Sequence, residues 1–105
     1  MPFNGNEGTM MDITDAGALT AAFRTKCPAQ PKGYFFGINN LNDILSQTGC
    51  MGIRIYFGWT TTNEFTMVLV GADCNENDQV ASGDNILDAG VPCPTACSQP
   101  DGLNS

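Results

Sequence analysis

The stretch that decides the fold is Cys50-Met-Gly-Ile-Arg-Ile-Tyr-Phe-Gly-Trp59, followed by Phe65-Thr-Met-Val-Leu-Val-Gly-Ala72. The polar turn Thr60-Thr-Thr-Asn-Glu64 separates these two apolar runs, and the acidic turn Asp73-Cys-Asn-Glu-Asn-Asp78 follows them. Each run has the length of a typical strand. Two strand-like runs joined by a short polar turn predict an antiparallel hairpin.

The two runs differ in how their apolar residues alternate. In residues 50–59, one face collects the apolar side chains Met51, Ile53, Ile55 and Phe57. In residues 65–72, both faces are apolar, which is typical of a strand covered on both sides. We therefore expect at least one further strand beside 65–72, supplied by the C-terminal part of the chain, by residues 34–36 or by a second subunit.

Two helices are expected before the hairpin. Thr14 is a good N-cap for a helix over residues 15–26, in which Ala16, Leu19 and Phe23 recur at helical spacing. For a second, shorter helix, the expected signals are an N-cap at Asn39 or Asn40, an apolar stripe of Leu41, Ile44 and Leu45, and a stop at Gly49.

These elements predict an α+β fold, with a small antiparallel sheet centred on the 50–59/65–72 hairpin and two helices packed on one face. A chain of 105 residues corresponds to one domain. We expect an N-terminal arm at residues 1–11, a single α+β domain at 12–97 and a flexible C-terminal tail at 98–105.

The charge balance disfavours several classes of function. The net charge of −7 arises from 11 acids and only four bases, so the basic footprint that nucleic-acid binding requires is missing. The longest apolar run, 67–72, is far shorter than the roughly 20 residues of a membrane-spanning helix, so no membrane insertion is expected. The first residues lack the pattern of a secretory signal, which favours a cytoplasmic location, with export by another route left open.

The acidic segment after the hairpin is the candidate cation site. Asp73, Asn75 and Asn77 stand at positions 1, 3 and 5 of a possible calcium loop, Gln79 stands at position 7, and Asp84 stands at position 12. The pattern departs from the usual loop, because Asp78 replaces the glycine of position 6 and Asp84 is shorter than the usual glutamate. The alternative is a turn in which Asp and Asn side chains bond to their own backbone.

Five cysteines are many for a cytosolic chain of this length. Cys93-Pro-Thr-Ala-Cys97 is a thiol pair for which three states stay open: free thiols, a disulfide that pins the tail, or a share in a metal site. The chain has no histidine, so Ser-His and Cys-His nucleophile pairs are excluded. Together with the lack of a glycine-rich phosphate loop, this absence predicts that the protein is not an enzyme.

Three aromatic residues are the expected contact anchors. Trp59 and Phe65 flank the hairpin turn, where an exposed aromatic side chain is a frequent anchor of interfaces. Phe3 lies in the N-terminal arm, which has no helical or strand period and is expected to dock on this chain or on a neighbouring one. Arg54, the lone charge on its strand, is expected to spread over Tyr56, with a buried ion pair as the alternative.

The chain resembles a group of small bacterial proteins without an assigned role. The residues that carry the resemblance are Gly49-Cys-Met-Gly-Ile-Arg-Ile-Tyr-Phe-Gly58, Leu69-Val-Gly-Ala-Asp73, Asn77-Asp78, Ile86-Leu-Asp-Ala-Gly90 and Pro92-Cys-Pro-Thr-Ala-Cys97. They fall within residues 12–97. The resemblance implies a compact single-domain protein and transfers no activity.

The sequence as a whole favours a non-enzymatic structural or interaction module. A strand apolar on both faces, an arm with apolar anchors and a low charge density together predict self-association into a homo-oligomer or a larger assembly. The alternative is a small calcium- or ligand-binding module that uses the acidic 73–84 turn. A cysteine-based redox or zinc role stands behind both.

Overall fold

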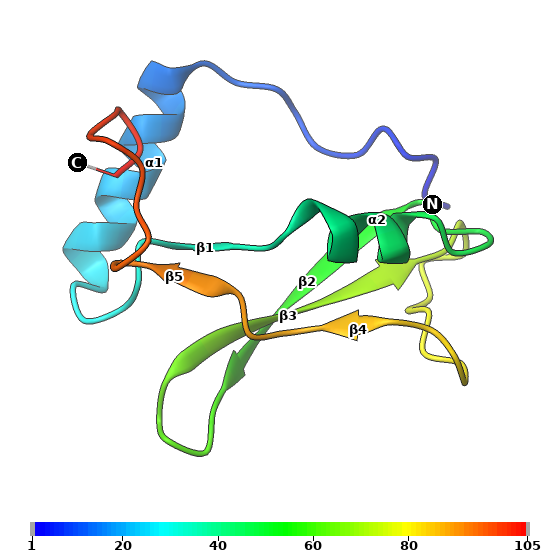
Figure 1. Cartoon of the computed structure of the whole chain (residues 1–105). Coiled ribbons are helices and arrows are strands. Elements are labelled where there is room, and N and C mark those ends of the chain that lie inside the picture. The colour runs from blue at the N-terminus through cyan, green and yellow to red at the C-terminus, as the bar shows by residue number, and fades with distance from the viewer. Residues whose placement is uncertain (1, 105) are drawn as a thin grey trace. The chain divides into compact units, whose positions relative to one another are not determined.

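The computed structural model describes residues 2–104 and contains two helices and five strands. Their bounds are α1 Ile13–Lys26, β1 Gly33–Phe35, α2 Ile38–Leu45, β2 Gly52–Trp59, β3 Phe65–Ala72, β4 Ile86–Leu87 and β5 Val91–Cys93 (Figure 1). By their internal contacts the residues form two compact units. The first unit contains 1–8 and 36–90, and the second contains 9–35 and 91–105.

The first unit is built on the predicted hairpin. β2 and β3 pair antiparallel over their full lengths, from Gly52 opposite Ala72 to Trp59 opposite Phe65. Asn63, with φ 65°, takes the left-handed conformation in the connecting turn, which asparagine tolerates better than most residues. The hairpin prediction is therefore confirmed.

A third strand lies beside β3, as the apolar pattern predicted. β4 pairs with β3 through Leu69 opposite Leu87 and Val70 opposite Ile86, so the sheet order is β2-β3-β4. The C-terminal part of the chain supplies this strand, whereas residues 33–35 form β1 and pair with β5 in the second unit. Leu69 and Val70 are buried at the point where the three strands meet.

Helix α2 packs on β2 and β3 and contributes Ile44, the most deeply buried side chain among the described residues. The helix begins directly after Gly37, which offers no side-chain cap, so neither Asn39 nor Asn40 is the N-cap. Both asparagines lie inside the first turn instead. A helix of eight residues is too short to be stable on its propensity alone, so burial of Ile44 holds it in place.

The second unit joins α1 to the β1–β5 pair. Asp12 rather than Thr14 caps α1, because the Asp12 carboxylate accepts the backbone N–H of Asp15 at 2.8 Å. Aspartate is the stronger N-cap, and the helix gains two residues at its start compared with the predicted range 15–26. Its predicted end is confirmed at Lys26.

The end of the chain folds back on α1 instead of forming a free tail. Asp101 accepts the backbone N–H groups of Leu103 and Asn104, which closes a turn. Arg24 donates to the carbonyl oxygen of Leu103 at 2.6 Å, and Lys32 donates to that of Asn104 at 2.8 Å. Two of the four bases of the chain thus hold the C-terminal segment, which was expected to be flexible.

The fold class is α+β, as predicted. By their internal contacts, residues 12–97 are divided between the two units, and the predicted boundaries at 11 and 98 stay predictions. The arm residues 2–8 belong with the hairpin, and α1 belongs with β1, β5 and the C-terminal turn. Among residues 2–104, no helix is long and apolar enough to cross a membrane.

Gly17 explains how the C-terminal turn approaches α1 so closely. A Cβ atom at Gly17 would lie 2.4 Å from the carbonyl oxygen of Gly102. We predict that Gly17→Ala displaces residues 101–104 from α1, even though alanine favours the helix by about 1 kcal/mol. Hydrogen exchange should show faster exchange at the amides of 103 and 104, and unchanged exchange there would contradict the prediction.

Candidate functional site

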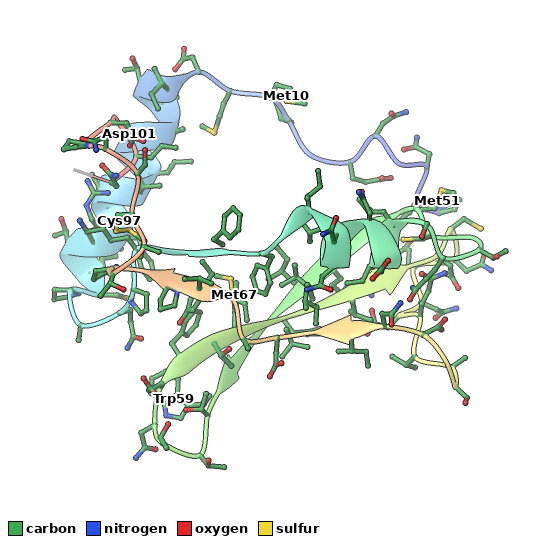
Figure 2. The ribbon with its side chains drawn as sticks, viewed as in Figure 1. Met10, Met51, Trp59, Met67, Cys97 and Asp101 are labelled. Carbon is green, nitrogen blue, oxygen red and sulfur yellow. A yellow bond between two sulfur atoms is a disulfide. The ribbon has the colours of Figure 1, made fainter. Side chains whose placement is uncertain are left out.

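The hairpin carries an exposed aromatic surface near its turn. We define the hairpin patch as Ile55, Phe57, Trp59 and Phe65. The ring centroids of Phe57 and Phe65 lie 5.9 Å apart, and those of Trp59 and Phe65 lie 6.5 Å apart in a T-shaped arrangement. Phe57 is 74% exposed and Trp59 is 60% exposed, and Figure 2 shows Trp59 at the turn end of the hairpin.

The hairpin patch stays open because the cover over this sheet face is confined to the other end. Near Gly71, on the same face, an added Cβ would meet the side chains of Gln79, Gln47 and Cys50. Gln47 and Cys50 belong to the segment that leads from α2 into β2. The same face is therefore packed at one end of the hairpin and exposed at the other.

The outer edge of β2 is open along the hairpin patch. In the sheet of the described residues, β2 has β3 as its only neighbour. The Thr60 N–H donates to the carbonyl oxygen of Glu64, directly beyond the ends of the two strands. In an antiparallel ladder, residue pairs that exchange hydrogen bonds alternate with pairs that do not. The even-numbered residues of β2 therefore bond to β3, and the N–H groups of Ile55, Phe57 and Trp59 point outward. The open edge and the exposed aromatic side chains belong to the same residues.

On the opposite face of the hairpin, Arg54, Tyr56 and Asp78 form a polar network. The Asp78 carboxylate accepts hydrogen bonds from the Tyr56 hydroxyl and from the Arg54 guanidinium, which also forms an ion pair with it. Arg54 and Tyr56 stand two residues apart on one strand face, and the bridge between Ala72 and Asp78 brings the carboxylate to them. Arg54 thus has a carboxylate partner as well as its neighbour Tyr56, and the pair is partly exposed, with side-chain exposures of 30% and 25%.

This network shifts the pKa of each member. The Tyr56 hydroxyl is the main cause that lowers the pKa of Asp78, and Arg54 lowers it further. The hydrogen bond to Asp78 raises the pKa of Tyr56 and also that of Arg54. The folded state therefore favours an ionised Asp78 between a neutral tyrosine and a charged arginine.

We predict that Asp78 stabilises the fold in a pH-dependent way. Because its folded pKa lies below the unfolded value of about 3.9, its contribution is complete above that pH and is lost as the pH falls toward the folded pKa. Asp78→Asn should therefore lower the urea midpoint at neutral pH, and the difference from wild type should shrink in acid. Asp88→Asn, which removes the same charge elsewhere, is the matched control. A difference that stays constant with pH would contradict this prediction.

The acidic turn uses its side chains for its own backbone. One oxygen of Asp73 accepts the N–H groups of Asn75 and Asn77, at 2.9 and 3.0 Å. Gln79 bonds through its side chain to Gln47 and to the carbonyl of Thr48, and Asp84 accepts the N–H of Ala81. Among residues 2–104, no three His, Cys, Asp or Glu side chains are grouped to hold a metal ion. Calcium binding by this turn stays a prediction.

The two hydrogen bonds that Asp73 accepts predict different losses of stability for two substitutions at this position. We predict that Asp73→Ala destabilises the protein by about 1 kcal/mol, the net value of a typical hydrogen bond. Asp73→Asn should be closer to wild type, because an amide oxygen still accepts both N–H groups. Urea unfolding without added metal measures both variants. An equal loss in the two would contradict the role given to this oxygen.

Cys93 and Cys97 are joined by a disulfide, one of the three states that the sequence left open. The bond lies just after β5, where the chain turns toward residues 98–104, and Cys97 is labelled in Figure 2. The other three cysteines are free thiols: Cys27 and Cys50 are half-buried, and Cys74 is exposed. A disulfide persists in oxidising compartments, so this bond and the expected cytoplasmic location favour different environments.

The predicted anchors lie at two places in the first unit. Trp59 and Phe65 meet in the hairpin patch, whereas Phe3 docks beside the start of β2. Sequence reasoning passed over Phe57, although it shares the apolar alternation of Ile55 and is the most exposed member of the patch. It also left Asp78 without a role, because only the folded turn brings that residue to Arg54.

The comparisons with known proteins give no family for this chain, so its function has to be argued from the geometry. No protein-family model, no curated protein and no solved structure matches this chain. The resemblance to a group of small bacterial proteins therefore stays a prediction.

Proposed function

We propose that this protein is a non-enzymatic structural or interaction module that associates with copies of itself through β2. The observation that carries the proposal is that β2 combines an open outer edge with an exposed apolar face, both at Ile55, Phe57 and Trp59. An exposed strand edge is a template for pairing with another strand. Apolar side chains beside that edge add burial to the backbone hydrogen bonds.

The partner that fits this surface is a second β2. Two identical strands pair antiparallel around a two-fold axis, so that each edge satisfies the other. Their outward N–H groups are those of the odd-numbered residues, and the odd-numbered side chains also share one face. In the pair, the hairpin patches of both copies form one continuous apolar surface. Removing this surface from water is favourable.

Electrostatics opposes this association only weakly. The chain has a net charge of −7, but none of the four residues of the hairpin patch is charged. Arg54, the one charged residue of β2, is neutralised by Asp78 within the same copy. Two β2 edges can therefore approach each other without bringing unpaired like charges together.

We predict that Ile55→Lys weakens self-association by at least about tenfold, because a lysine on an open strand edge blocks strand pairing. Ile38→Lys is the matched control, since it makes the same change at an exposed isoleucine of α2. Sedimentation velocity over a range of concentrations measures the dissociation constant of wild type and of both variants.

Two results would contradict the proposal. A wild-type protein that stays monomeric at every concentration would exclude self-association. Equal weakening by Ile55→Lys and Ile38→Lys would mean that association depends on net charge or on another surface rather than on β2.

A further inference from the structure

The N-terminal arm, residues 2–8, is docked on the first unit by specific contacts. The Phe3 N–H donates to the carbonyl oxygen of Cys74 at 2.9 Å, and the Phe3 ring lies 5.5 Å from the guanidinium carbon of Arg54. Arg54 is itself held by Asp78. The polar network on the hairpin therefore also fixes the cation against which Phe3 packs, a favourable cation–π arrangement.

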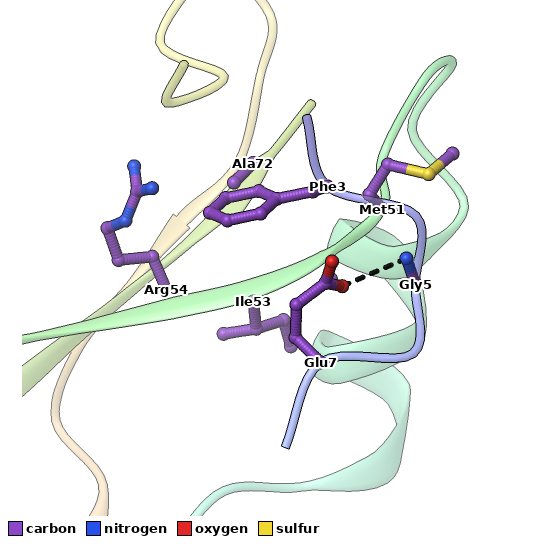
Figure 3. Close-up of a pocket in the computed structure, with 8 residues that line it drawn as sticks. Phe3, Gly5, Glu7, Met51, Ile53, Arg54 and Ala72 are labelled. Atoms are coloured by element: carbon purple, nitrogen blue, oxygen red, sulfur yellow. Dashed lines mark hydrogen bonds between the residues drawn. The ribbon is translucent and has the colours of Figure 1, made fainter. Parts of the chain in front are cut away.

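The arm passes around the outer edge of β2. Together with the start of β2 it lines an open cavity of about 330 Å³. The cavity wall includes Ile53 from one face of the strand and Arg54 from the other, and β3 occupies the inner side. Figure 3 shows Phe3 near Ala72 and Arg54, with Glu7 on the side of Ile53. A segment that touches both faces of a strand from outside must cross its free edge.

The arm keeps its own shape at this crossing. Glu7 accepts the N–H groups of Asn4 and Gly5 through its two carboxylate oxygens, and Asn4 accepts the N–H of Asn6. These bonds bend the arm into a compact turn beside Met51. The bent arm occupies the space that a second strand would need to pair with the first half of β2.

We infer that the arm is a removable guard of the β2 edge, which limits pairing with a second copy to Ile55–Trp59. The inference rests on the proposed self-association and adds its regulation. With the arm docked, the edge at Ile53 is covered and only the hairpin patch is open. With the arm released, the whole of β2, from Gly52 to Trp59, is open to the β2 of another copy.

The arm is docked through Phe3 and is followed by a glycine. The backbone hydrogen bond of Phe3 and its contact with Arg54 tie the arm to the first unit, and Gly5 lies beside Met51. Gly8 follows with φ 98°, a conformation that glycine adopts readily, and Met10 beyond it is 99% exposed. The arm can therefore swing away at Gly8 without disturbing the packing of the sheet.

The test compares Phe3→Ala with Met10→Ala, a matched truncation of an exposed side chain just beyond the arm. Phe3→Ala should strengthen self-association between about twofold and fivefold, the factor that an exposed cation–π contact is worth. Met10 lies just beyond the arm, in the second unit, so Met10→Ala should match wild type. Sedimentation velocity measures association, and hydrogen exchange at dilute protein measures the cover directly, because Phe3→Ala should speed exchange at the Ile53 amide, which faces the outer edge of β2.

Each outcome decides the inference. Unchanged exchange at the Ile53 amide would overturn the guard, whatever the association state. Weaker association of Phe3→Ala would also overturn it and would indicate that the arm links copies instead of separating them. If Phe3→Ala exchanges faster but both it and wild type stay monomeric, the arm covers β2 without guarding an interface. This result would refute the proposed self-association as well.

Discussion

The pairing of β2 with β3 is the constraint on which the first unit depends. The register from Gly52 opposite Ala72 to Trp59 opposite Phe65 fixes which side chains share a face. It directs Arg54 and Tyr56 to one side, where Asp78 meets them, and the hairpin patch to the other. A slip by one residue would reverse every side chain of the strand. The polar network and the apolar surface therefore have a single structural cause.

Three of the four bases of this acidic chain make hydrogen bonds that hold its segments in place. Arg24 and Lys32 donate to carbonyl oxygens of the C-terminal turn, and Arg54 donates to Asp78. A charged donor bonded to a backbone oxygen fixes a loop that has too few apolar side chains to pack by itself. These charged contacts lie outside the hairpin patch, which contains no charged residue.

The sequence predicted what local pattern determines. Alternation at residues 50–59 and 65–72 was enough to place the hairpin, and the position of Trp59 at the end of its strand was enough to predict that it is exposed. It was not enough for contacts between distant segments. Gly17 lies inside the helix predicted over residues 15–26, and only the structure shows that it is a point of close approach, because Gly102 lies against it. The N-cap at Asp12 shows the same limit at short range, since two acceptable caps compete and the stronger one extends the helix.

The open part of β2 lacks the usual protections of a strand edge. Proteins generally protect such edges with lysine, proline, bulges or a covering segment. Residues 55–59 contain neither lysine nor proline, and Arg54, the one base of the strand, points to the opposite face. A covering segment is present only at the start of the strand, where Phe3 docks. Protection is thus built at one end of β2 and missing at the other, where the exposed aromatic side chains lie. That coincidence of an open edge with exposed aromatic side chains is what supports the proposed pairing through β2.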